Sequence, residues 1–212
     1  MTAELIPARA PGAVSRAARL LRDGQVVAIP TETVYGLAVL PADANLRRLL
    51  NVKRRSSDKG IQLLIDSLEQ VRGLVDVTAA GERLAERFWP GPLTLVLDQR
   101  AEAGLSPLLT GSRPTVALRL PDHEVPRRLA RQLGPLAASS ANITGAAPAT
   151  TAQHVLATLG DEVPLILDDG PVRSGVASTV VAWPAGQLEP SILREGALSR
   201  AQILAALTQA ED

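Results

Sequence analysis

The sequence predicts an α/β fold around a mixed β-sheet, and three observations support this class. Short runs rich in β-branched residues alternate with longer amphipathic segments. Some predicted strands follow one another with no helix between them, which favours a mixed sheet over a purely parallel one. With 212 residues, of which 46% are hydrophobic and 21% charged, the chain is long enough to bury one core. We therefore treat residues 1–212 as a single domain.

The N-terminal quarter contains a clear helix and a clear strand. Residues 1–11 are expected to form a frayed or edge segment. A helix is predicted over 13–22, because its apolar residues share one face and Gly24 follows as a stop. Residues 26–29 are an apolar run typical of a buried strand, and Pro30 ends it because proline has no N–H to donate.

The remaining elements follow from the same signals. A helix over 43–52 has Asp43 as a candidate N-cap, Thr78 caps a helix over 78–88, and residues 115–120 alternate as in a half-buried strand. Further strands are predicted at 61–65, 93–97, 136–138, 165–167, 178–183 and 188–193. Further helices are predicted at 67–74, 124–133, 151–159 and from the cap Ser199 to residue 206. Loops or turns are predicted at 99–113 and 184–187.

Composition excludes several classes of protein. The net charge of +0 provides no global field for nucleic acid, and 2% aromatic residues argue against a stacking platform for single strands. The chain has no cysteine, so it forms no disulfide, and no 18-residue apolar run predicts a membrane span. These features predict a soluble, cytoplasmic protein that makes no membrane contact.

Common cofactor motifs are missing. There is no phosphate-binding P-loop and no dinucleotide-binding glycine fingerprint after the first strand. The two histidines, His123 and His154, are far apart in sequence, so no protein metal site is expected. Asp168, Asp169 and Gly170 are better explained as a β-turn than as a metal site.

Two stretches between residues 26 and 60 attract attention. The first strand opens into a loop that carries the hydroxyls of Thr31, Thr33 and Tyr35. The only two lysines of the chain, Lys53 and Lys59, both fall in the segment K-R-R-S-S-D-K-G. Taken alone, this basic segment fits a helix C-terminus whose charges complement the helix dipole.

Other polar residues sit at strand ends and have two interpretations. Arg119 ends an apolar strand, where it could pair with a buried carboxylate or clamp an anionic ligand. The segment from Ser139 to Asn142 could be turn chemistry, Ser178 is ordinary in a strand, and Arg194 could be solvated.

The order of seven motifs adds a resemblance to these observations. The segments are P-T-E-T-V-Y-G-L, K-x-R-x-x-x-K-G, F-W-P-G-P-L-T-L-V, T-V-A-L-R-L-P, S-S-A-N-I-T-G, A-S-T-V-V and I-L-R-E-G-A. In this order and spacing the chain resembles the YrdC-like (TsaC-like) threonylcarbamoyl-AMP synthases over roughly residues 12–200. Ser56, Gly60 and Leu64 depart from residues that many or some members carry at those positions.

The resemblance implies a fold and an activity. The fold is a twisted, mixed sheet that forms an open-sided, barrel-like cavity with flanking helices. The activity is synthesis of L-threonylcarbamoyladenylate from L-threonine, bicarbonate and ATP, with release of pyrophosphate and with Mg²⁺ accompanying ATP. The product would pass to a TsaD-type transferase that modifies tRNA next to the anticodon.

The resemblance also implies the roles of individual residues. Lys53 and Arg55 would be catalytic. ATP would be bound by Arg55, Lys59, Thr115, Ser140, Asn142 and Arg194. L-threonine would be bound by Thr33, Tyr35, Arg119 and Ser178.

Two alternatives belong to other functional classes. The basic patch over 47–59 could track the phosphates of a double-stranded RNA or tRNA, although neutral net charge and few aromatic residues disfavour this. A carbamoyl-adenylate domain of the hydrogenase-maturation type is disfavoured because its accompanying acylphosphatase and zinc-finger regions are missing.

Overall fold

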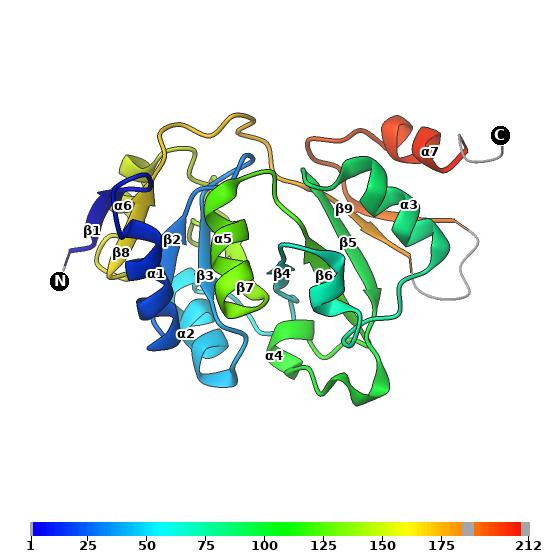
Figure 1. The fold of residues 1–212 in the computed structure, drawn as a ribbon, viewed down its shortest axis with the longest axis horizontal. Helices are drawn as coiled ribbons and strands as arrows, with labels where there is room; N and C mark the ends of the chain where they lie inside the picture. Colours follow the sequence, from blue (N-terminus) through cyan, green and yellow to red (C-terminus); the bar gives the residue numbers. More distant parts are fainter. Residues whose placement is uncertain (1, 184–188, 209–212) are drawn as a thin grey trace.

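One open sheet organises the molecule. The computed structural model describes residues 2–183 and 189–208, and within them the strands form a ten-stranded sheet in the order β1-β8-β2-β3-β7-β4-β6-β5-β9-β10 (Figure 1). The strands are β1 (Glu4–Pro7), β2 (Val27–Ile29), β3 (Gly36–Val39), β4 (Gln62–Leu64), β5 (Leu93–Asp98), β6 (Thr115–Arg119), β7 (Leu136–Ser140), β8 (Leu165–Asp168), β9 (Thr179–Ala182) and β10 (Ser191–Arg194). The helices are α1 (Ala13–Arg22), α2 (Asp43–Lys53), α3 (Ala79–Phe88), α4 (Pro107–Thr110), α5 (Glu124–Leu133), α6 (Ala152–Leu159) and α7 (Arg200–Thr208).

The sheet is mixed, as the sequence predicts. β1 and β2 run parallel to β8, β4 parallel to β6, and β5 parallel to β9. The pairs β2–β3, β3–β7, β4–β7, β5–β6 and β9–β10 are antiparallel. The ends of the sheet are β1 and β10, so it does not close into a barrel, and the expected twisted, open-sided sheet is confirmed.

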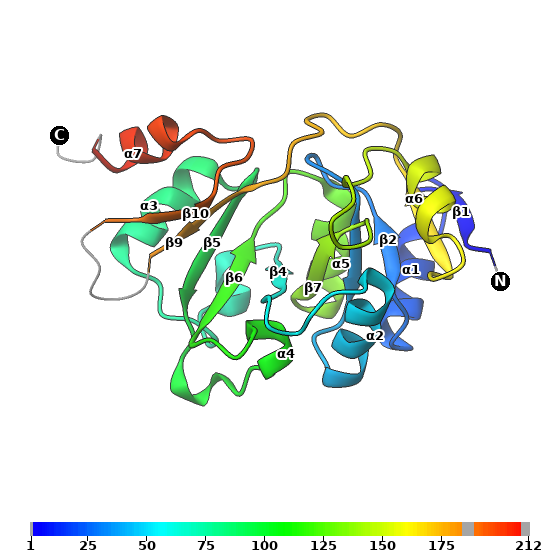
Figure 2. The same cartoon turned by 180° about the vertical axis from the view of Figure 1, so that it is seen from behind.

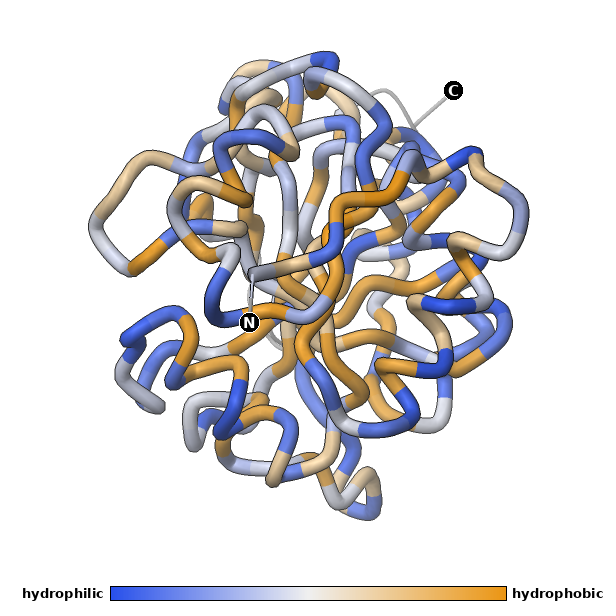
Figure 3. The backbone as a smooth tube through the Cα atoms, turned by 90° about the vertical axis from the view of Figure 1, so that its left-hand side faces the viewer, coloured by the Kyte–Doolittle hydropathy of each residue, from blue (hydrophilic) through white to orange (hydrophobic). Residues whose placement is uncertain are grey.

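Helices cover both faces of the sheet on the side of β1. α1 and α5 lie on one face (Figure 1), and α2 and α6 lie on the other (Figure 2). Strand alternation explains why both faces are apolar: Val27 and Ile29 pack in the cluster that contains α1, whereas Ala28 packs in the opposite cluster. Hydrophobic segments accordingly run through the interior, and hydrophilic ones gather at the periphery (Figure 3).

Several predicted helix boundaries are confirmed by their hydrogen bonds. Thr78 accepts a bond from the backbone N–H of Gly81, and Ser199 accepts one from that of Gln202. Gly24 follows α1 with a left-handed φ of 72°. Asp43 is the first residue of α2 rather than its cap, so that prediction is off by one residue.

Three predictions about elements need correction. No strand is predicted at β3, because its first residues, Gly36 and Leu37, close the hydroxyl-rich loop motif. The helix predicted over 67–74 is only a 3₁₀ turn at Leu68–Val71, and the loop predicted over 99–113 contains α4. The turn predicted at 184–187 lies outside the described residues.

Two further predictions concern the N-terminal segment and membrane-spanning helices. The expected edge segment at the N-terminus contains β1, which pairs with β8. Across residues 2–183 and 189–208, none of the helices is both long enough and apolar enough to cross a membrane.

The packing of α1 generates a stability prediction. Leu21 is fully buried between α1 and the sheet, whereas its neighbour Arg22 is exposed. Leu21→Ala should lower the free energy of unfolding by about 2–5 kcal/mol, because it removes buried methyl groups and leaves a void. Arg22→Ala should change it by less than about 0.5 kcal/mol. Urea titration of both variants measures the difference, and equal small effects would contradict the packing described.

Candidate functional site

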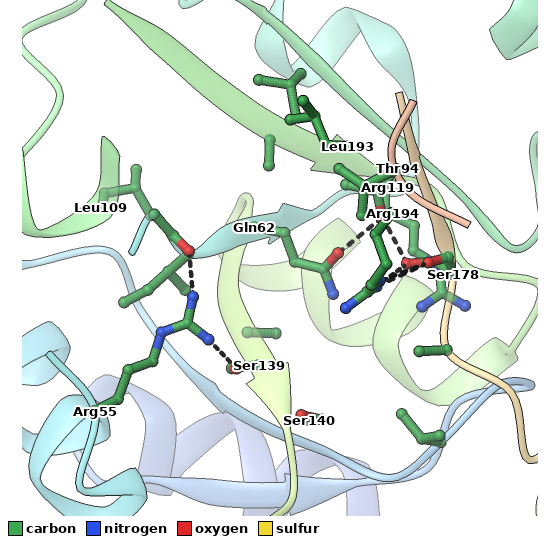
Figure 4. A pocket seen from close by; sticks show the side chains of 18 of the residues that line it. Arg55, Gln62, Thr94, Leu109, Arg119, Ser139, Ser140, Ser178, Leu193 and Arg194 are labelled. Atoms are coloured by element: carbon green, nitrogen blue, oxygen red, sulfur yellow. Dashed lines mark hydrogen bonds between the residues drawn. The ribbon is translucent and has the colours of Figure 1, made fainter. Parts of the chain in front are cut away.

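A cavity of about 800 Å³ lies beside the sheet on the side of β5, β6 and β9. Alternate residues of these strands face it: Thr94 and Val96 from β5, and Thr115, Ala117 and Arg119 from β6. The loop after α2 contributes Arg55, β7 contributes Ser139 and Ser140, and β10 contributes Leu193 and Arg194 (Figure 4). The open sheet therefore leaves a concave face whose polar groups come from widely separated stretches of the chain.

Arg119 is held in the cavity wall by hydrogen bonds to two other segments of the chain. It is 3% exposed, and its Nη2 lies 2.7 Å from Glu32 Oε1 and 2.9 Å from Thr33 Oγ1. Its Nε donates to the carbonyl of Gly91 at 3.2 Å. The structure is compatible with both interpretations of Arg119, because its side chain pairs with a buried carboxylate and also borders the cavity.

Arg55 reaches the cavity from the opposite side. Its Nη2 donates to the carbonyl of Gly60 at 2.7 Å, and its Nη1 donates to Ser139 Oγ at 3.3 Å. These acceptors are neutral, and the Nε of Arg55 is buried without a hydrogen-bond partner. The guanidinium is therefore positioned by the protein but not neutralised by direct contact with a carboxylate.

Arg194 belongs to a polar network on the third side. Its Nη2 donates to the Ser178 carbonyl at 2.7 Å, and the Ser178 hydroxyl lies 2.8 Å from that of Thr94 (Figure 4). Thr94 in turn donates to Gln62 Oε1 at 3.0 Å. A row of hydroxyl and amide groups therefore runs from β9 across β5 to β4.

The cavity carries excess positive charge. Burial lowers the pKa of Arg55, and the charge of Arg194 lowers it further, against the opposing effect of Asp58. Burial also lowers the pKa of Arg194, and the charge of Arg119 adds to this shift. Four arginines line the cavity, namely Arg55, Arg113, Arg119 and Arg194, and among the described residues only Arg119 of these four forms an ion pair with a carboxylate. Such a site favours an anionic ligand.

Ser140 and Asn142 border the same space at the carboxyl end of β7. The amide nitrogen of Asn142 donates to the carbonyls of Ile143 and Ala146, at 2.8 and 2.9 Å. Its Oδ1 is buried without a partner. Buried acceptors are usually satisfied, so this oxygen is suited to a donor group of a bound ligand.

The chain does not offer a protein-made metal site here. No carboxylate is among the described residues that line the cavity, and the described ranges contain no group of three acidic, histidine or cysteine side chains able to hold a metal. Because Mg²⁺ prefers carboxylate and phosphate oxygens, it fits this cavity only as a companion of a phosphate ligand.

The structure brings most of the predicted site residues together. Those that line the cavity are Arg55, Thr115, Arg119, Ser140, Asn142, Ser178 and Arg194. The four others, Thr33, Tyr35, Lys53 and Lys59, are not among its lining residues.

Two residues of the hydroxyl-rich loop support the site from behind. Thr33 is fully buried, and its hydroxyl forms hydrogen bonds with Arg119 and Thr31. Tyr35 points to the other side of the loop, where its hydroxyl donates to the Gly170 carbonyl at 2.7 Å and accepts from the Asp169 N–H at 3.2 Å. Burial is the main reason that the pKa of Tyr35 rises to about 12. The predicted direct contact of Tyr35 with threonine is therefore corrected: Tyr35 anchors the loop.

The two lysines differ from their predicted positions. Lys53 is 2% exposed, and its ammonium donates to the carbonyl oxygens of Ser140 and, at 2.8 Å, Asn142. Lys59 is exposed, and the structure uses its carbonyl as an acceptor for Arg55. Neither lysine is among the lining residues of the cavity, and the left-handed conformation of Arg54, with a φ of 49°, separates Lys53 from Arg55, which does line it.

Sequence reasoning missed some residues of the site. Gln62 and Thr94 each interrupt an apolar strand, and their polarity was the signal that one strand face meets a ligand rather than a core. Glu32 stands next to Thr33 in the loop motif, but nothing in the sequence identifies it as the partner of Arg119. Ser139 was noticed only as part of its motif.

Comparisons with known proteins identify the family of the chain. The family model described as telomere recombination, which covers Sua5, YciO and YrdC, matches residues 19–196. A threonylcarbamoyl-AMP synthase of Pyrococcus abyssi is 41% identical over 193 residues, which are 88% of this chain and 55% of the relative. One of Bacillus subtilis is 39% identical over 197 residues, covering 92% of this chain and 56% of the relative. The chain thus spans a little over half the length of these two relatives.

Solved structures extend the similarity to the fold. The crystal structure of P. abyssi Sua5 complexed with L-threonine superimposes with a TM-score of 0.88 at 36% identity, covering 97% of this chain and 61% of the other. Escherichia coli YciO has a TM-score of 0.80 at 20% identity, covering 93% of this chain and 97% of the other, and shows that the fold is shared. With a family match over most of its length and relatives near 40% identity, the chain belongs to the Sua5/YciO/YrdC family.

Proposed function

We propose that this chain makes L-threonylcarbamoyladenylate from L-threonine, bicarbonate and ATP, releasing pyrophosphate. One observation carries the proposal: four arginines, Arg55, Arg113, Arg119 and Arg194, line one cavity, and among the described residues a single carboxylate, that of Glu32, pairs with one of them. The names of the relatives and the threonine complex of one solved neighbour support the choice of substrates.

The chemistry requires this kind of charge. The threonine amine attacks the carbon of bicarbonate, water leaves, and the resulting carbamate is an anion. A carbamate oxygen then attacks the α-phosphorus of ATP, and the bond from this phosphorus to the pyrophosphate oxygen breaks. Two anions must be held together, and the leaving pyrophosphate must be stabilised. Fixed positive groups in a poorly screened cavity supply both effects.

The roles of the residues follow from their positions. Arg119, held by Glu32 and Thr33, keeps its Nη1 available and would bind the threonine carboxylate. On the other side, Arg55 and Arg194 would face the phosphates, with Mg²⁺ entering as the counter-ion of ATP. Neutral groups of Thr115, Ser140, Asn142 and Ser178 would orient the substrates through hydrogen bonds.

The fate of the product is part of the proposal. A carbamoyl-adenylate is a mixed anhydride, so a second protein that transfers the threonylcarbamoyl group must consume it. The expected partner is the TsaD-type transferase that acts on tRNA, and the expected location is the cytoplasm.

The RNA-binding alternative loses support in the structure. Arg47 pairs with Asp43, Arg48 donates to the carbonyl of Gly24, and Lys53 is buried. The 47–59 segment is therefore not one continuous row of free cations, which a phosphate-tracking patch requires.

Co-substrate dependence is the first test. Pyrophosphate release should require threonine and bicarbonate together, because the nucleophile forms only from both. The measurement is pyrophosphate release in complete mixtures and in mixtures that lack one co-substrate. Equal release without either compound would indicate a simple ATP hydrolase.

Arg119→Lys tests the threonine end of the cavity. Lysine keeps the charge but loses the planar fork that is shared between Glu32 and a carboxylate, so the threonine KM should rise by about tenfold or more. The KM for ATP should change little. Arg173→Lys, at the exposed pair with Asp122, is the matched control. An unchanged threonine KM would leave Arg119 as a structural ion pair only.

Arg55→Ala and Arg54→Ala separate the enzyme from the RNA module. Arg55 borders the cavity whereas Arg54 is exposed, so only Arg55→Ala should lower kcat/KM, by about tenfold or more. An RNA patch would respond to total charge, and the two changes would then weaken RNA binding equally. Equal losses of RNA affinity, without synthesis in the parent protein, would overturn the enzyme assignment.

A further inference from the structure

Lys53 joins the end of α2 to the loop that follows β7. Its side chain donates to the carbonyls of Ser140 and Asn142, and its own carbonyl accepts from the N–H and the hydroxyl of Thr144, at 2.9 and 3.0 Å. Four hydrogen bonds at both ends of one residue therefore fix the 140–144 loop to the helix.

This arrangement places Lys53 behind the cavity rather than in it. The Ser140 and Asn142 side chains border the cavity, while their carbonyl oxygens accept from Lys53. The left-handed turn at Arg54 separates the two basic residues, so that Arg55 reaches the cavity and Lys53 remains buried beneath the loop.

We propose that Lys53 is a positioning residue that holds the 140–144 loop in the arrangement that binds ATP, so that ATP affinity falls when the side chain of Lys53 is replaced by an apolar one. The proposal rests on the proposed function, because it assumes that the loop contacts ATP. Hydrogen bonds from an ammonium are charge-assisted and roughly twice as strong as neutral ones, so Lys53 is suited to hold the two carbonyls in place.

The surroundings of Lys53 disfavour its charge. Burial lowers the pKa of Lys53 to about 8, and the charge of Arg55 contributes. The loop presents carbonyl oxygens to the ammonium, and among the described residues Arg55 is the charged group whose effect on Lys53 is resolved. The carbonyl oxygens of the loop are therefore the groups that hold the ammonium in place.

The lowered pKa also fixes the sign of the pH dependence. The pKa of Lys53 is lower in the folded chain than the ordinary value of 10.5, so the unfolded chain binds more protons between these values. Raising the pH through this window therefore makes Lys53 favour the folded state. The positioning role of Lys53 is accordingly tested by substitution at one pH.

Calorimetric titration with ATP at about pH 7.5 tests the positioning role of Lys53. Lys53→Met should bind ATP about fivefold more weakly than the parent protein, because the two carbonyls of the loop lose their hydrogen-bond donor. Arg54→Met, a change at an exposed neighbour, should bind ATP as the parent does. Equal ATP affinity in the parent and in Lys53→Met overturns the proposal.

Two further measurements distinguish positioning from other failures. Threonine affinity at about pH 7.5 should be equal in the parent and Lys53→Met, because Arg119 is held by other segments; a matching loss would mean general damage and contradict the proposal. If the parent binds no ATP at any pH, the proposed function fails. The positioning of the 140–144 loop by Lys53 is then tested by amide hydrogen exchange at Thr144 and Ala146. Weaker protection of these amides in Lys53→Met than in Arg54→Met supports the positioning role, and equal protection refutes it.

Discussion

The buried pair between Arg119 and Glu32 is the interaction on which the site depends. A guanidinium that is 3% exposed requires a counter-charge, and Glu32, itself 6% exposed, supplies it at 2.7 Å. Through Arg119 the pair also connects β6 to the loop after β2 and to the Gly91 carbonyl before β5. The cavity wall is therefore fixed where three segments meet, while Arg55 and Arg194 bring further positive charge from the other sides.

Much of this could be predicted from the sequence, because it depends on local patterns. Period-two alternation in residues 115–119 gives both the strand and the face on which Arg119 lies. Caps such as Thr78 and Ser199 mark helix starts, since their hydroxyls bond to the backbone N–H groups that follow. The ordered motifs indicated that residues near 55, 119, 140, 178 and 194 belong together, and the cavity lining brings these five positions to one place.

The features that could not be predicted from the sequence depend on tertiary geometry. Tyr35 turns away from the cavity because β3 pairs with both β2 and β7, and this pairing fixes which face each side chain takes. Lys53 and Arg55 point to different places because the chain adopts a left-handed conformation at Arg54. Arginine rarely adopts this conformation, so the sequence gives no sign of it. The partner of Arg119 also comes from a distant segment, so neither spacing nor composition could identify Glu32.

The central claim is that one cavity holds threonine and ATP together, with the charges of Arg55, Arg119 and Arg194 facing the anionic groups. The most direct measurement is a crystal structure of this chain with L-threonine and a non-hydrolysable ATP analogue. The account predicts the threonine carboxylate on Arg119 and the phosphates between Arg55 and Arg194, with the nucleotide near Ser140 and Asn142. Either ligand bound outside this cavity, or a threonine carboxylate away from Arg119, would contradict it.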